Sequence, residues 1–253
     1  MKSTTDSHWN ERARAIADDV EVNIMDIFQR ELEYDYVCSL LEPTMRVLEV
    51  GCGNGFSTER FRELVEWVDA FDYAENMVER ARERVGERNN RFLHDNVLDP
   101  KHLDGPYDAV VCVRVLINLQ DLEQQRLALR NIGEQLRAGG LLILAEGFTD
   151  GFEQLSALRR RVSLPPVEPA KINFYSALDD LLPVLRESYD EVGAFHLGAY
   201  DYLTRVVYPT VAGADNVRHN TVFSEHCAEL ARAFNPACFE ELSRMRGFAL
   251  RKR

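Results

Sequence analysis

The chain has 253 residues, of which 45% are hydrophobic and 28% charged, so it can build the core of one large domain and is not a disordered chain. Its 30 basic and 42 acidic residues give a formal net charge of −12. This balance argues against a nucleic acid as the partner, because such binders present a basic surface. The five cysteines form no CxxC pair and the six histidines show no HxH or HxxxH spacing, so we expect neither a disulfide framework nor a metal site.

The N-terminal segment lacks an apolar stretch followed by a small-residue cleavage site, and no apolar run approaches the length of a bilayer span. We therefore expect a cytoplasmic chain that does not bind a membrane. Residues 1–45 are expected to form a helical cap. A mixed polar stretch from Trp9 to Ala17 is followed by apolar residues at helical spacing: Ile24, Ile27, Phe28 and Leu32.

From residue 46 onward, short apolar strands alternate with helices, which predicts a doubly wound, mostly parallel α/β sheet. Ser57 is expected to cap the helix after the first strand, and Gly139-Gly140 to end the helix after the fourth. A helix is also expected to start at a Ser176 cap. The strands are expected at 46–50, 68–71, 91–94, 107–115, 141–145, 191–197 and 248–252. We expect a single domain, with a ligand-binding core at 46–147 and a substrate-facing cap with the final strands at 148–253.

A glycine-rich turn joins the first strand to its helix, with the sequence Glu49-Val-Gly-Cys-Gly-Asn-Gly55. Glycines there let the backbone turn tightly and approach a ligand closely, and the helix amides that follow can meet an anion. The spacing is GxGxG, whereas dinucleotide binders carry GxGxxG, so a nicotinamide cofactor is disfavoured.

Acidic residues end the next two strands of the predicted sheet. Asp72 ends the second strand, where its carboxylate can accept both hydroxyl protons of a ribose diol. Asp95 ends the third strand, where it can accept from the amino group of an adenine. The alternative for both residues is that they only cap the helices that follow.

These segments together resemble the class I S-adenosylmethionine-dependent methyltransferases, in particular bacterial small-molecule methyltransferases. VLEVGCGNG (47–55) is similar to motif I, FDYAENMVERAR (71–82) to the segment with the ribose-binding acid, and FLHDNVLD (92–99) to the adenine-contact strand. The resemblance implies a Rossmann-like seven-stranded sheet whose last strand is antiparallel. It also implies S-adenosyl-L-methionine as cofactor and S-adenosyl-L-homocysteine as product.

The resemblance implies a cofactor-binding set when it is carried over residue by residue. For Met77 the alternative is ordinary helix core, and for Trp9 it is burial between the cap and the body of the domain. Arg114 departs from the family pattern, in which a small or apolar residue is usual at this position. The set is Trp9, Arg14, Glu49, Gly51, Gly53, Asn54, Gly55, Asp72, Tyr73, Met77, Asp95, Asn96, Val97 and Arg114.

A second set of residues would act on the substrate. Some relatives carry a His pair after the fourth strand, where this chain has Asn118, so either the transfer needs no strong base or the base comes from the cap. The catalytic candidates are Asn118, Tyr175, His196 and Arg205. The substrate-binding candidates are Arg159, Asn173, Tyr175, Tyr200, Tyr202 and His219. Their Arg and Tyr side chains suit an acceptor with a carboxylate, a phosphate or several hydroxyls.

The sequence therefore predicts methyl transfer to an oxygen, or with less support a nitrogen, of a small polar metabolite, sugar or natural-product intermediate. The alternative is a catalytically silent methyltransferase-like protein that binds or regulates.

Overall fold

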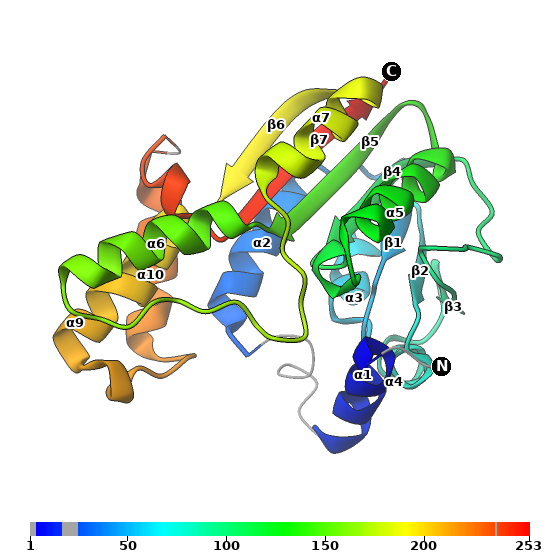
Figure 1. The fold of residues 1–253 in the computed structure, drawn as a ribbon. Helices are drawn as coiled ribbons and strands as arrows, with labels where there is room; N and C mark the ends of the chain where they lie inside the picture. The colour runs from blue at the N-terminus through cyan, green and yellow to red at the C-terminus, as the bar shows by residue number, and fades with distance from the viewer. Residues whose placement is uncertain (1–3, 17–24, 236) are drawn as a thin grey trace.

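The computed structural model of the chain describes residues 4–16, 25–235 and 237–253 (Figure 1). Ala17, the last residue of the mixed polar stretch, and Ile24 lie outside these residues. The strands are β1 (Arg46–Val50), β2 (Trp67–Asp72), β3 (Asn90–His94), β4 (Tyr107–Val113), β5 (Leu136–Gly147), β6 (Tyr189–His196) and β7 (Met245–Lys252). The α-helices are α1 (Thr4–Ala15), α2 (Ile27–Ser39), α3 (Phe56–Phe61), α4 (Glu75–Val85), α5 (Leu122–Gln135), α6 (Thr149–Arg161), α7 (Leu178–Ser188), α8 (Gly198–Tyr202), α9 (Tyr208–Ala212) and α10 (Val222–Ala233). Short 3₁₀ turns are η1 (Leu116–Asn118), η3 (Ala214–Asn216) and η4 (Glu240–Leu242), and η2 (Leu203–Val207) is a π-helix.

The described residues form one seven-stranded sheet in the order β3-β2-β1-β4-β5-β7-β6. Strands β1 to β5 run parallel, and β7 lies antiparallel between β5 and β6. The predicted fold class, a Rossmann-like doubly wound sheet with an antiparallel last strand, is confirmed. In this arrangement the order in which strands are added to the sheet reverses between β1 and β4, and such a switch point is where open α/β sheets bind ligands.

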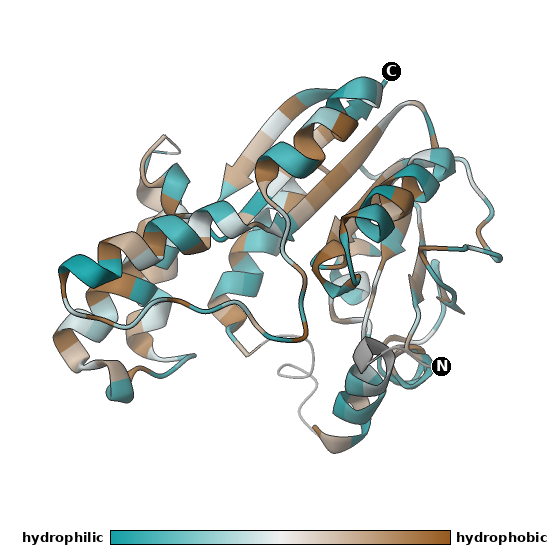
Figure 2. Ribbon diagram, viewed as in Figure 1, coloured by the Kyte–Doolittle hydropathy of each residue, from teal (hydrophilic) through white to brown (hydrophobic). Residues whose placement is uncertain are grey.

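Alternate residues of each central strand enter two different hydrophobic cores. In β1, Leu48 packs into the core covered by α5 and α7, whereas Val47 packs into the core covered by α2, α3 and α4. Both side chains are fully buried, as expected for a parallel strand with helices on both faces. Figure 2 shows hydrophobic residues along β5 and polar residues on the outward faces of the helices.

Three local predictions differ from the structure. Gly55 rather than Ser57 precedes α3, because its positive φ of 76° makes the turn, and the Ser57 hydroxyl instead binds the Glu49 carboxylate. Strand β5 already begins at Leu136, so the helix before it ends ahead of Gly139-Gly140. Helix α7 has Ala177 at its N-cap, because the Ser176 hydroxyl donates a hydrogen bond to the Gln125 side-chain oxygen and does not cap the helix.

A second group of helices, α6 and α8 to α10, extends away from the sheet beyond the end of β5 (Figure 1). Asp26 fastens the start of α2 to this group, because it accepts from the Tyr200 hydroxyl at 2.7 Å and pairs with Arg205 at 3.1 Å. The division into cap, core and substrate-facing segments stays a prediction. Within the described ranges, no helix has the length and apolar character needed to cross a membrane.

Candidate active site

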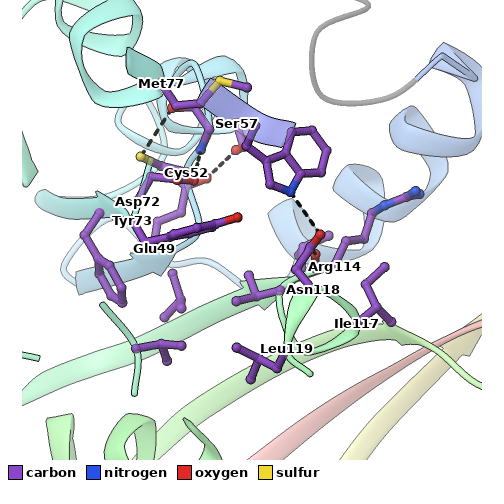
Figure 3. A pocket seen from close by; sticks show the side chains of 18 of the residues that line it. Glu49, Cys52, Ser57, Asp72, Tyr73, Met77, Arg114, Ile117, Asn118 and Leu119 are labelled. Carbon is purple, nitrogen blue, oxygen red and sulfur yellow. Dashed lines mark hydrogen bonds between the residues drawn. The ribbon is translucent and has the colours of Figure 1, made fainter. Parts of the chain in front are cut away.

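The main cavity, of about 450 Å³, opens at the carboxyl ends of β1, β2 and β4. Figure 3 shows Asp72 and Tyr73 on one side of it and Arg114 and Asn118 on the other. Helices α1 and α2 complete the wall. Their contributions are His8, Trp9 and Arg12 from α1, and Arg30, Glu33 and Tyr34 from α2.

The glycine-rich turn after β1 forms the floor of the cavity. The backbone amides of Gly51 and Cys52 donate to the Phe71 carbonyl at 2.8 and 3.0 Å, which folds the turn onto the end of β2. Gly51 has a φ of +71°, and a Cβ there would lie 2.5 Å from the Val115 side chain. Only glycine allows the turn to pass this closely under the β4 loop.

Two buried carboxyl groups stand beside this turn. Asp72 accepts from the Gly53 amide at 3.0 Å and from the Ala74 amide at 2.8 Å, and burial raises its pKa to about 6. Glu49 accepts from the Ser57 and Thr58 hydroxyls, and burial raises its pKa to about 7. Both groups therefore change charge near neutral pH, and a ligand that donates hydrogen bonds to them favours the ionised form.

Helix α1 is attached across the mouth of the cavity. The Trp9 indole donates to the Asn118 amide oxygen at 3.0 Å, and the Asn118 amide nitrogen donates to the Arg114 carbonyl at 2.7 Å. Arg12, three residues after Trp9 on the same helix face, lines the cavity with its guanidinium 5.9 Å from the indole ring centre. The predicted Arg14 is exposed on another face of the helix.

Glu146, at the end of β5, holds the loop that follows β4. It is almost fully buried and accepts from the backbone amides of Val115 and Leu116 at 2.7 Å and of Ile117 at 3.4 Å. Sequence reasoning missed this residue, although a lone carboxylate at the end of an otherwise apolar strand is a usable signal. Arg114, which begins the loop, has a φ of +59°, a strained backbone for an arginine.

We expect Glu146→Ala to lower the free energy of unfolding by about 3 kcal/mol, because buried amides that lose their acceptors each cost about 1–3 kcal/mol. Urea denaturation monitored by circular dichroism measures this value. Glu134→Ala, at an exposed position on α5, is the control and should change stability by less than about 0.5 kcal/mol. Equal stabilities of the two variants would show that the loop does not depend on Glu146.

Helix α2 contributes a carboxylate that the sequence did not indicate. Glu33 is 0% exposed, and its Oε1 accepts from Gln29 Nε2 at 2.9 Å and from Arg114 Nη1 at 3.3 Å. Its Oε2 is buried without a hydrogen-bond partner among the described residues. A buried carboxylate oxygen without a partner is costly, so a ligand or solvent donor is needed at this point of the cavity wall.

A second cavity, of about 210 Å³, adjoins the first and shares Met25, Arg114 and Ile117 with it. It lies between α2, α6, η2 and the beginning of β7. The polar side chains that line it are Asp26, Gln29, Arg114, Tyr175, Arg205, His219 and Arg244.

The structure brings most of the predicted residues to one of the two cavities. Those that line the main cavity are Trp9, Glu49, Gly51, Gly53, Asp72, Tyr73, Met77, Asn96, Val97, Arg114, Asn118 and Asn173. Those that line the second cavity are Arg114, Tyr175, Arg205 and His219. Asn54 and Gly55, at the end of the glycine-rich turn, are buried and line neither cavity.

Five predicted side chains are instead used within the protein. Asp95 accepts from the backbone amides of Asn96, Lys101 and His102, so its carboxylate is turned into the loop after β3. Arg159 donates to the Pro165 and Arg205 carbonyls. The remaining three are Tyr200, bonded to Asp26, Tyr202, stacked on Phe239, and His196, which accepts from the Gly198 amide. No group of three or more possible metal ligands occurs among the residues that the structure describes.

Comparison with known proteins identifies the domain. Residues 47–140, which include the glycine-rich turn, Asp72 and the β4 loop, match the family model described as "Methyltransferase domain". The chain carries a class I S-adenosylmethionine-dependent methyltransferase domain. Proteins with this domain take the methyl group from S-adenosylmethionine, and the glycine turn and the strand-end carboxylate described above are features that suit this cofactor.

Two relatives illustrate the range of this methyltransferase domain. Malonyl-[acyl-carrier protein] O-methyltransferase from Bacillus cereus is 30% identical over 120 residues, which are 47% of this chain and 43% of the relative. Nodulation protein S from Azorhizobium caulinodans is 31% identical over 97 residues, 38% of this chain and 46% of the relative. The chain thus aligns with less than half the length of these two proteins.

Among solved structures, the N-methyltransferase NodS from Bradyrhizobium japonicum with bound S-adenosylhomocysteine has a similar fold over its whole length. The TM-score is 0.62 with 16% identity, and the match covers 99% of each chain. At this identity the likeness establishes the fold of the methyltransferase and leaves its acceptor open.

Proposed function

We propose that the chain is an enzyme that transfers a methyl group from S-adenosylmethionine to an oxygen or nitrogen of a small polar molecule. The observation that carries the proposal is the main cavity, which the glycine-rich turn, Asp72 and Glu49 line together with residues of α1 and α2. The net charge of the chain, −12, favours a small molecule over a nucleic acid as substrate. We also propose that the enzyme acts in the cytoplasm.

The cofactor would be held by residues from three strand ends. We assign the aminoacyl part to Glu49, Gly51 and Gly53, and the ribose to Asp72. Tyr73, Met77, Asn96 and Val97 would surround the adenine, and Trp9 would cover the cofactor from α1. These assignments rest on the positions of the side chains around the main cavity.

The chemistry divides between the cofactor and the protein. When bound, S-adenosylmethionine supplies an electrophilic methyl group on its sulfonium sulfur, which keeps the electron pair of the broken S–C bond. The acceptor atom loses its proton as it gains the methyl group, and we propose that Glu33 Oε2 takes this proton. Glu33 lines the main cavity, its Oε2 has no hydrogen-bond partner among the described residues, and Arg114 Nη1 donates to its other oxygen, Oε1, at 3.3 Å. Alignment of the reactants and exclusion of water supply the rest of the rate acceleration.

Two measurements test the proposal and separate it from a silent binding protein. Calorimetry should detect S-adenosylhomocysteine binding to the wild type. Incubation with methyl-labelled S-adenosylmethionine and a panel of hydroxyl- and amine-bearing metabolites should then give a labelled product. Binding without any labelled product favours the regulatory alternative, and absence of binding contradicts the cofactor assignment.

We also expect the affinity for S-adenosylhomocysteine to fall as the pH is lowered through 6. The free protein holds Asp72 with a pKa of about 6, and a ribose diol needs the ionised carboxylate, so binding below this pH requires loss of a proton. One pH unit below the pKa costs about 1.4 kcal/mol, which is about a tenfold weaker Kd at pH 5 than at pH 8. Glu49, with a pKa of about 7, acts in the same direction. Calorimetry at several pH values measures the effect, and an affinity that rises toward acid pH would exclude this role for Asp72.

A further inference from the structure

The second cavity is lined by an excess of guanidinium groups in an otherwise acidic protein. Among the described residues that line it are three arginines, Arg114, Arg205 and Arg244, but only one carboxylate, that of Asp26, which pairs with Arg205. Arg114 comes from the loop after β4, Arg205 from η2, and Arg244 directly precedes β7, so no local run of charged residues places them together. The fold therefore brings guanidinium groups from three distant segments together in this one cavity.

Carboxylates hold two of these guanidinium groups in position. Arg244 donates through Nε and Nη2 to Asp201, at 2.9 and 2.6 Å, and Asp201 is fully buried outside the cavity lining. Arg205 Nη2 donates to Asp26 at 3.1 Å, while its Nε is buried without a hydrogen bond in the described part of the chain, 3.9 Å from Asp201. Burial, and then the nearby charge of Arg244, lowers the pKa of Arg205. A guanidinium that is desolvated beside a like charge gains most from an anion.

From this arrangement we infer that the second cavity is an anion subsite that binds a carboxylate or phosphate group of the methyl acceptor. This inference rests on the proposed function and names the acceptor class: a small molecule with an anionic group. With the anion on Arg205 and Arg244, the rest of the acceptor extends past Arg114 and Ile117, which line both cavities, toward Glu33. A volume of about 210 Å³ admits a phosphate or carboxylate on a short chain and is too small for a nucleotide.

Inorganic phosphate is the probe for this subsite, measured by calorimetry with and without bound S-adenosylhomocysteine and at constant ionic strength. We expect millimolar binding to the wild type and at least fivefold weaker binding to Arg205→Lys, which keeps the charge toward Asp26 but loses the planar donors. Arg218→Gln is the matched control. It removes a positive charge at an exposed position one residue from His219 and outside the cavity lining, so phosphate binding should not change.

A second measurement on the wild type avoids the risk that Arg205→Lys fails to fold. Phosphate should protect Arg205 and Arg244 from phenylglyoxal, as mapped by peptide mass spectrometry, whereas Arg218 should react equally with and without phosphate. Absence of phosphate binding, equal weakening by Arg218→Gln, or no protection of the two arginines overturns the inference. Because the phosphate measurement does not require the cofactor, it stays interpretable if S-adenosylhomocysteine fails to bind and the proposed function itself is wrong.

Discussion

Asp72→Ala is expected to weaken the binding of S-adenosylhomocysteine about a hundredfold or more. Asp72 is the buried carboxylate at the end of β2, and two ribose hydroxyls would donate to it. Hydrogen bonds to a charged group contribute about 1.5–3 kcal/mol each, so the loss of two corresponds to about 3 kcal/mol or more, and every 1.4 kcal/mol is tenfold in Kd. The variant also leaves the Gly53 and Ala74 amides without their acceptor, which loosens the glycine-rich turn. Calorimetry at pH 8, where the wild-type carboxylate is ionised, measures the change.

The control for this variant is Glu75→Gln, three residues further along the chain. Glu75 is exposed in the first turn of α4 and does not line the cavity, so Kd should stay within about twofold. Circular dichroism and the thermal midpoint establish that both variants are folded. A folded Asp72→Ala protein with the wild-type Kd would show that the ribose is held elsewhere.

The cofactor side of the site could be predicted because its signals are local. A short apolar strand, a glycine-rich turn and a carboxylate at the next strand end are each readable within a few residues. The parallel order of the sheet then brings the strand ends to one edge, where Glu49, Gly51 and Asp72 line the same cavity. Asp95 shows the limit of this reasoning, because the loop after β3 folds back and supplies three amides to its carboxylate.

The acceptor side could be predicted only in part: the candidates Tyr175, Arg205 and His219 line the second cavity, but the contacts that bring them there join distant segments. Asp26 meets Tyr200, Arg205 and His219, which follow it by more than 170 residues, and no periodic pattern encodes such pairs. Helix α2 was also misleading. The apolar spacing of this helix suggested one buried face, yet Gln29, Arg30 and Glu33 are buried as well. The helix lies between the sheet and the second group of helices, so both of its sides are covered.

Glu33→Gln is expected to lower kcat by about 10² to 10⁴, the usual contribution of a general base, while Kd for S-adenosylhomocysteine stays within about twofold. The glutamine keeps the size of the side chain and an oxygen for Gln29 and Arg114, but it cannot take the proton of the acceptor. Rates are measured with labelled S-adenosylmethionine and the acceptor found in the metabolite panel.

The defect of this variant should depend on the acidity of the acceptor, which distinguishes lost proton transfer from a merely structural fault. An analogue whose hydroxyl or amine ionises more readily needs less help from a base, so it should recover part of the lost rate in Glu33→Gln. Glu31→Gln, on the same helix but paired with Arg60 at 2.7 Å away from the cavity, should behave as wild type with both acceptors. An unchanged kcat in Glu33→Gln would mean that the transfer needs no base. A large loss of S-adenosylhomocysteine affinity would instead place the Glu33 carboxylate on the cofactor, because the unpartnered Oε2 must then satisfy a donor of the cofactor rather than of the acceptor.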